Sequence, residues 1–153
     1  RYNVIINTIA KTNIDWCENN KVETANVNVN LAVNLAERCV KTGKKYVFFS
    51  SACIFESKNI RDIKYEDSTP NPACFYAKTK AMAEELILQV NPDALVIRQR
   101  LPLSEVPHPR NTINKLRSYP VIQNNQESVT VVEDMLPVLH GLILMNQKNT
   151  TAK

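Results

Sequence analysis

Glycine is the residue that this sequence lacks most clearly. The 153 residues contain only two glycines, Gly43 and Gly141, whereas glycine makes up about 7% of an average globular protein. A loop that wraps around a phosphate or a dinucleotide needs several glycines within a few positions. The sequence therefore contains no Gly-rich phosphate loop.

Several other signatures are missing. The cysteines form no CxxC pair, and the two histidines, His108 and His140, lack the spacing of metal ligands, so we assign no metal. We find no signal peptide and no apolar stretch of about 18 residues. The four cysteines are Cys17, Cys39, Cys53 and Cys74. We therefore expect a reducing, cytoplasmic setting and no membrane partner.

The overall composition is that of a folded chain with one core, with 44% hydrophobic and 22% charged residues. The formal net charge of +4 is spread along the chain rather than gathered in a basic run. Such a surface suits a phosphate-bearing substrate, and no nucleic acid partner is needed to explain it.

Apolar runs predict a parallel sheet, because their β-branched and aromatic residues leave no polar face. The runs expected as strands are 2–7, 45–50 and 94–98. Helices are expected over about 22–41, closed by Gly43, and over about 75–90. A strand, a helix and a strand in that order predict a right-handed βαβ unit, and hence an α/β fold.

Two parts of the chain differ from this pattern. Residues 51–72 form a long irregular excursion, and such loops in α/β domains are usually functional. After Arg100, prolines divide the chain into shorter pieces. The pieces are a helix at 111–118, a strand at 128–132 and a helix at 133–145. We interpret residues 1–100 as part of the sheet domain and residues 101–153 as part of a small substrate-binding cap.

Tyr76 and Lys80 are the first candidate site residues. Residues four apart on a helix share one face, so the pair brings an ammonium beside a phenol and is expected to favour the phenolate. Such a pair is common on helix surfaces and is weak evidence alone. Ser51, at the end of a predicted strand, strengthens it, because open α/β sheets bind ligands at the carboxyl ends of their strands.

The motifs IINTIAKTNIDWCE, VNVNLAVNLAERC, YVFFSSACIFE, NPACFYAKTKAMAEELI and VIRQRLP occur in order along nearly the whole chain. Together they resemble extended short-chain dehydrogenases/reductases of the dTDP-4-dehydrorhamnose reductase type. The resemblance implies a Rossmann-type parallel sheet, here partial, and a nicotinamide cofactor, NADPH or NADH. It also implies that Ser51, Tyr76 and Lys80 are catalytic, that Asn7 and Thr12 line the cofactor, and that Asn28 supports Lys80.

Shorter motifs, among them DWCE, KVET, CIFE and RxRxP, resemble the bifunctional branch of this family, a 3,5-epimerase/4-reductase of NDP-4-keto-6-deoxyglucose. In that branch Cys53 and Lys115 match the epimerase positions. A thiol and an ammonium on either side of a sugar ring can exchange the acidic protons beside a C4 ketone. The sequence leaves open which of the two is the acid. A buried cysteine and a solvated lysine are the structural alternatives.

Further residues are candidates for binding the nucleotide diphosphate, with surface salt bridges as the alternative. They are Arg98, Arg100, Arg110 and Asn111. The substrate is expected to be a UDP- or dTDP-sugar, and the full-length protein is expected to form a homodimer.

Departures from the family pattern guide the choice within it. The family's first strand and its G-x-x-G-x-x-G would precede Arg1. Ala52 stands where plain reductases often have Asp, and Gln99-Arg100 replaces their usual Thr-Ser. Both departures favour the bifunctional branch. The alternatives are a non-catalytic regulatory subunit resembling the β subunit of methionine adenosyltransferase, and an epimerase or dehydratase acting on another NDP-sugar.

Overall fold

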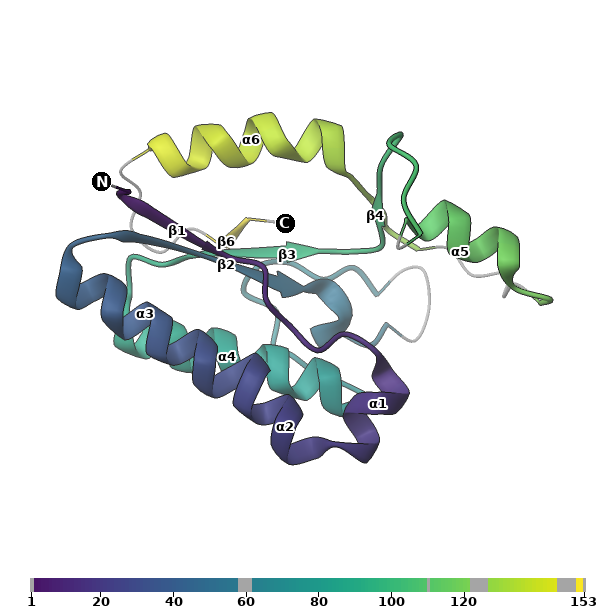
Figure 1. Ribbon diagram of the computed structural model, residues 1–153, viewed down its shortest axis with the longest axis horizontal. Coiled ribbons are helices and arrows are strands. Elements are labelled where there is room, and N and C mark those ends of the chain that lie inside the picture. Colours follow the sequence, from purple (N-terminus) through teal and green to yellow (C-terminus); the bar gives the residue numbers. More distant parts are fainter. Residues whose placement is uncertain (1, 58–61, 110, 122–126, 146–150, 153) are drawn as a thin grey trace.

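The computed structural model describes residues 2–57, 62–109, 111–121, 127–145 and 151–152. Its centre is a parallel sheet with the strand order β1-β2-β3-β6. The strands are β1 (Val4–Asn7), β2 (Lys45–Ser51), β3 (Leu95–Gln99) and β6 (Thr151–Ala152). Helices cover both faces, so the molecule has three layers (Figure 1). The predicted α/β fold with a Rossmann-type parallel sheet is confirmed.

The helices between β1 and β2, together with α4, cover one face of the sheet. Their bounds are α1 (Ile14–Asn19), α2 (Lys21–Ala25), the π-helical segment η1 (Asn26–Asn30), α3 (Leu31–Thr42) and α4 (Phe75–Val90). Small residues such as Ala32, Ala36 and Ala83 let these helices lie close to Tyr46 and Phe48 of the sheet. The single helix predicted at 22–41 corresponds to α2 and α3, with the π-helical segment η1 between them. Helix α1 was not predicted.

Gly43 ends α3 in the left-handed conformation, with φ at 62°. This is the conformation that a residue with a Cβ adopts at a cost, so the predicted C-cap is confirmed.

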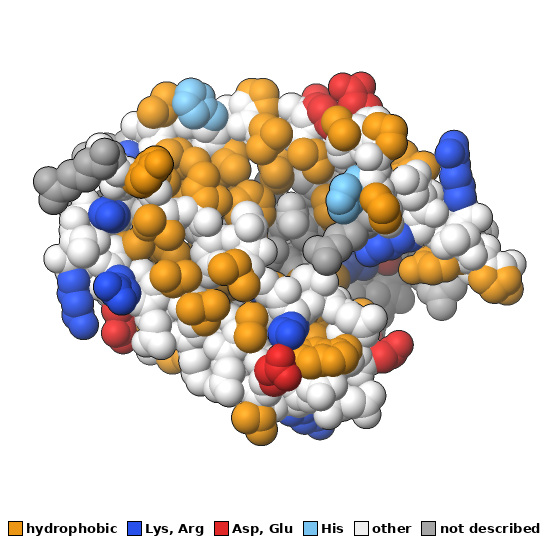
Figure 2. Space-filling view, viewed as in Figure 1, with side chains coloured by type: hydrophobic (Ala, Val, Ile, Leu, Met, Phe, Trp, Pro, Cys, Tyr) orange, Lys and Arg blue, Asp and Glu red, His pale blue; other side chains and the backbone are white. Residues whose placement is uncertain are grey.

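The opposite face is covered by α6 (Val132–Leu144). Leu139 is buried there against Val47, Leu95 and Ile97 of the strands. The outer side of the helix carries exposed apolar residues beside the polar Asp134 and His140, and Figure 2 shows hydrophobic side chains along α6 and over the strand layer beneath it. Its large exposed residues are Leu136, Val138 and Leu144.

The rest of the chain lies near the carboxyl ends of the strands. It comprises the 3-10 turn η2 (Ala52–Ile54), β4 (Pro102–Leu103), α5 (Thr112–Ser118) and β5 (Thr130–Val131). β4 and β5 form a separate two-stranded sheet, and α5 projects beyond the main sheet (Figure 1). The strand expected at 128–132 is observed as β5, which has only two residues. The strands β4 and β6 were not predicted. No helix in the described residues has the length and apolarity needed to cross a membrane.

Candidate active site

Ser51 is the last residue of β2, and its side chain connects two parts of the site. Its hydroxyl accepts a hydrogen bond of 3.2 Å from the backbone N–H of Cys53 and so caps η2. The same side chain lies near Tyr76, which stands in the first turn of α4, and it lowers the pKa of the phenol. The fold therefore brings Ser51, Cys53 and Tyr76 together at the carboxyl end of β2.

Tyr76 is a phenol held in its protonated form. Burial raises its pKa to about 12, although the neighbouring Ser51 side chain acts in the opposite direction. Lys80 is not among the groups that shift this pKa. Burial sets the direction of the shift in this structure, and the expected effect of the lysine on the phenolate stays a prediction. A protonated phenol is suited to donating a proton.

Lys80 lies one helical turn after Tyr76 and is 2% exposed. Its Nζ donates a hydrogen bond of 2.6 Å to the Phe49 carbonyl and lies 4.0 Å from the centre of the Phe48 ring. Burial lowers its pKa to about 8, while the Glu84 carboxylate raises it. Glu84, four residues further along α4, was not predicted as part of the site, although its i, i+4 spacing from Lys80 could have indicated it.

Asn28 stands in η1 and joins two segments of the site. Its Oδ1 accepts a hydrogen bond of 2.8 Å from the Lys11 N–H, and its Nδ2 donates to the Lys11 carbonyl and to Thr79 Oγ1, both at 3.1 Å. Thr79 directly precedes Lys80, so Asn28 contacts the helix beside the lysine rather than the ammonium. π-turns are often found next to functional sites, and this one lies beside the candidate site.

Asn7 and Thr12, the predicted cofactor-lining residues, lie after β1. The Asn7 side chain is buried, donating 2.9 Å to the Tyr46 hydroxyl and accepting 3.0 Å from the Ile9 N–H. It therefore shapes the turn that follows the strand. Thr12 is exposed in the loop that leads to α1. Their roles towards a cofactor stay predictions.

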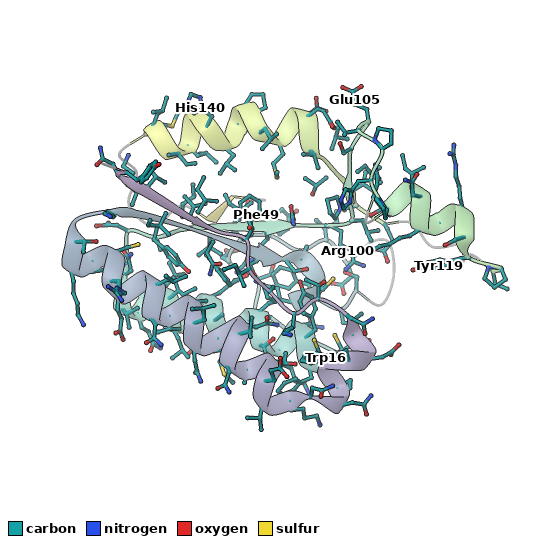
Figure 3. The ribbon with its side chains drawn as sticks, viewed as in Figure 1. Trp16, Phe49, Arg100, Glu105, Tyr119 and His140 are labelled. Atoms are coloured by element: carbon teal, nitrogen blue, oxygen red, sulfur yellow. The ribbon has the colours of Figure 1, made fainter. Side chains whose placement is uncertain are left out.

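Cys53 is partly buried, and its Sγ accepts a hydrogen bond of 3.0 Å from Arg100 Nη1. The parallel register of β2 and β3 explains the contact. Ser51 pairs with Gln99 at the end of the sheet, so the residues that follow these two strands, Cys53 and Arg100, lie close together. In Figure 3, Arg100 lies at the end of the sheet nearest α5, whereas Phe49 lies along the strands. Glu127, which pairs with Arg100 at 2.5 Å, was not predicted, and nothing in the sequence pattern identifies it.

The other predicted residues are less closely connected to this cluster. Arg98 is paired with Glu84 at 2.7 Å. Asn111 caps α5 and braces the preceding loop through the Ser104 carbonyl. Lys115 is exposed on α5, and within the described residues no interaction joins its side chain to Cys53. Arg110 lies outside the described residues. Their substrate and epimerase roles stay predictions.

Metal binding has no support in the part of the chain that the structure covers, where no three His, Cys, Asp or Glu residues gather into a metal site. All four cysteines are free thiols.

Comparisons with known proteins agree with this geometry. The family model of the RmlD substrate binding domain matches residues 1–137. The bifunctional dTDP-4-dehydrorhamnose 3,5-epimerase/dTDP-4-dehydrorhamnose reductase of Arabidopsis thaliana is 34% identical over 148 residues, covering 92% of this chain and 48% of that protein. A trifunctional UDP-glucose 4,6-dehydratase/epimerase/reductase of the same plant is 37% identical over 149 residues, covering 90% of this chain and 22% of that protein.

Solved structures show the same fold. The UDP-rhamnose synthase of Acanthamoeba polyphaga mimivirus superposes with a TM-score of 0.88 at 25% identity, covering 97% of this chain and 56% of that one. The dTDP-4-dehydrorhamnose reductase of Bacillus anthracis, in complex with NADP, superposes with a TM-score of 0.79 at 21% identity, covering 97% and 54%. The chain thus spans about half the length of these proteins or less. The resemblance inferred from the motifs is confirmed.

Proposed function

The chain belongs to the RmlD substrate-binding domain family, and on this basis we propose that the full-length protein is a nucleotide-sugar 3,5-epimerase/4-reductase. It would convert an NDP-4-keto-6-deoxyglucose, with UDP or dTDP as the nucleotide, into NDP-L-rhamnose. One observation carries the proposal: the Ser51 hydroxyl accepts a hydrogen bond from the Cys53 amide and lies near the Tyr76 phenol, whose pKa it lowers. A single side chain thus links the residue proposed for reduction to the residue proposed for epimerisation.

In the reduction, Tyr76 donates a proton to the C4 oxygen of the sugar. Its raised pKa keeps the phenol protonated at neutral pH, as a proton donor requires. Ser51 hydrogen-bonds the same oxygen and orients the ketone. Lys80 follows Tyr76 by one turn of α4 and is held by the Phe49 carbonyl; it would stabilise the charge that the phenol gains as the proton leaves.

The hydride is supplied by a nicotinamide cofactor, NADPH or NADH, when it is bound. Lys80 would hold the ribose of that cofactor, because an ammonium carries three donors and the Phe49 carbonyl accepts one of them. Thr12 and the turn shaped by Asn7 lie after the neighbouring strand, at the sheet edge where such folds bind ligands. The Bacillus anthracis protein of the same fold is in complex with NADP.

In the epimerisation, Cys53 and Lys115 exchange protons at C3 and C5. Each of these carbons is next to the C4 ketone, so loss of its proton gives an enolate, and inversion needs return of a proton to the opposite face. Cys53 lies beside Ser51 and Arg100, which supports its role as one of these two groups. Lys115 would have to approach the sugar from α5, which projects beyond the sheet.

Substrate binding is proposed for the region around α5 and the two-stranded sheet. Arg110 and Asn111 precede α5 in the sequence, and a guanidinium suits a diphosphate because its planar group presents several donors at once. Arg98 is the weaker candidate of the original set, because its guanidinium is already paired with Glu84. The division into a sheet domain at 1–100 and a substrate lobe at 101–153 is part of this proposal, although α6 and β6 pack on the main sheet.

The setting proposed for the protein is the cytoplasm, where thiols stay reduced. The four free cysteines support it. We also propose that the full-length protein is a homodimer, which sedimentation would test.

The test of the proposed function uses the full-length protein, NADPH and a UDP- or dTDP-4-keto-6-deoxyglucose, with the product identified by NMR. NDP-L-rhamnose is the expected product. Cys53→Ala should abolish the entry of solvent deuterium at C3 and C5, and full exchange in this variant would remove Cys53 from the epimerase. Binding of the nucleotide sugar without turnover would support a regulatory subunit instead, and turnover to a different sugar would support another NDP-sugar enzyme.

A further inference from the structure

Arg100 presents its guanidinium to a sulfur atom rather than to open solvent. Its Nη1 donates 3.0 Å to Cys53 Sγ, and the side chain is only 26% exposed. On the other edge, Nε and Nη2 both donate to Glu127 Oε2, at 2.9 and 2.5 Å. The planar fork is therefore divided between one carboxylate and one thiol.

The backbone around Arg100 is held as firmly as its side chain. Its N–H donates 3.0 Å to Thr130 Oγ1, and its carbonyl accepts 2.7 Å from the Thr130 N–H. The next residue, Leu101, has a φ of 39°, which is unusual for a residue with a Cβ. Such strain persists only where the surroundings impose it, and it is concentrated at functional sites.

We propose that Arg100, oriented by Glu127, is a positioning residue for Cys53 in the epimerisation. The inference rests on the proposed function and extends it to two residues. Glu127 fixes the rotation of the guanidinium plane, and Arg100 fixes the direction of the sulfur.

The chemistry explains why a guanidinium is useful at this point. As a sugar C–H bond breaks or forms, Cys53 takes or gives one proton, so its sulfur alternates between a thiol and a thiolate. A neighbouring cation favours the thiolate and stays protonated throughout, because arginine does not titrate in this range. A negative sulfur in turn favours the protonated phenol of Tyr76. The same site can therefore hold a proton acceptor and a proton donor together.

Two other roles of Arg100 make different predictions. If Arg100 binds the substrate diphosphate, its loss raises KM for epimerisation and reduction alike. If it only stabilises the fold, its loss lowers the melting temperature and both activities in parallel. A positioning role affects exchange at C3 and C5 while reduction is spared.

The first experiment measures both half-reactions in full-length Arg100→Gln. Deuterium entry at C3 and C5 is followed without NADPH, and NADPH oxidation is followed with the 4-keto-L-rhamnose nucleotide made by a separate epimerase. We expect exchange to fall by about 10²-fold, the scale of one proton-transfer group, with KM and the reduction rate within about twofold of wild type. Arg38→Gln, which removes an exposed arginine on α3, is the matched control.

The second experiment reads the thiol directly. Cys53 and Cys74 are both partly buried free thiols, so the ratio of their iodoacetamide labelling rates, measured by peptide mass spectrometry, compares two sites in one molecule. Arg100→Gln should lower the Cys53-to-Cys74 ratio several-fold, and Glu127→Gln should lower it by a smaller factor. Arg100→Lys should lower the ratio less than Arg100→Gln, because lysine keeps the positive charge but lacks the planar guanidinium.

The outcomes separate the inference from the proposed function. Wild-type protein that shows no exchange at C3 and C5 would contradict the proposed function. Wild-type exchange that persists at full rate in Arg100→Gln, or an unchanged labelling ratio, would overturn the role of Arg100 alone. A parallel rise of KM in both half-reactions would also overturn it, in favour of substrate binding.

Discussion

Glu84→Gln removes the charge from the most buried ion pair in the described residues. Arg98 Nε donates to both carboxylate oxygens of Glu84, at 3.2 and 3.0 Å, and Nη2 donates to Oε2 at 2.7 Å. The two side chains are 11% and 5% exposed. The glutamine keeps the shape and one acceptor oxygen, so the variant tests the charge rather than the packing.

The expected cost follows from what the change leaves behind. Arg98 keeps one bond of 2.8 Å, from Nη1 to the Glu66 carbonyl, but no carboxylate neutralises it. Breaking a buried pair from one side typically costs 3–5 kcal/mol, and retention of one acceptor places this case at the lower end, about 3 kcal/mol. With a urea m-value near 2 kcal/mol/M, the unfolding midpoint should fall by about 1.5 M. The pKa of Lys80 should fall further, since Glu84 raises it.

Urea unfolding followed by circular dichroism measures this change in the full-length protein. Glu85→Gln is the matched control, because Glu85 is exposed and its carboxylate accepts a long bond of 3.4 Å from Gln89; its effect should be within about 0.5 kcal/mol. The double variant Glu84→Leu/Arg98→Met should recover most of the loss, since an apolar pair leaves no lone charge. Equal midpoints for Glu84→Gln and Glu85→Gln would refute the reasoning.

Three further predictions concern buried polar groups. Burial lowers the pKa of Lys80 from 10.5 to about 8. Between these pH values the unfolded chain binds more protons than the folded chain, so the lysine's contribution to stability rises with pH. The unfolding free energy of wild type should therefore rise relative to that of Lys80→Met as pH increases across this window, and parallel pH curves would contradict it. Tyr46→Phe should cost about 1–3 kcal/mol, measured by urea unfolding, because the Tyr46 hydroxyl accepts from Asn7 and donates to the Ala32 carbonyl. Ser50→Ala should leave stability unchanged or raise it by up to about 1 kcal/mol, because the buried Ser50 hydroxyl has no hydrogen-bond partner in the described residues; a clear drop in melting temperature would show that it has one.

Local patterns in the sequence predicted three of the four strands of the main sheet and the helix that carries Tyr76 and Lys80. The run from Phe75 to Val90 forms α4 as expected, because alanine, leucine, lysine and glutamate all favour helices. Tyr76 and Lys80 do not lie on an open helix surface, since Lys80 is 2% exposed and burial raises the pKa of Tyr76; their catalytic roles stay predictions. Helix α1 could have been predicted, because Asn13 caps it and Asp15 stands in its first turn.

Contacts between residues far apart in the chain could not be predicted from the sequence. The contact of Arg100 with Cys53 depends on the register of β2 and β3, and its pairing with Glu127 depends on how the chain returns from α5. The π-turn at Asn26–Asn30 has no local signature, because its residues fit an ordinary helix equally well. The raised pKa of Tyr76 arises from burial, which a residue pattern does not measure.

The central claim is that Ser51, Cys53 and Tyr76 form one site with two separable reactions. The most direct test follows one sample of full-length Tyr76→Phe with an NDP-4-keto-6-deoxyglucose and NADPH in deuterated water by NMR. Deuterium should still enter C3 and C5 at a rate close to wild type, while reduction falls by about 10²-fold or more. Tyr2→Phe, at an 85% exposed phenol, should behave as wild type. Loss of exchange together with reduction, in a variant with unchanged melting temperature, or reduction at the full rate, would contradict the claim.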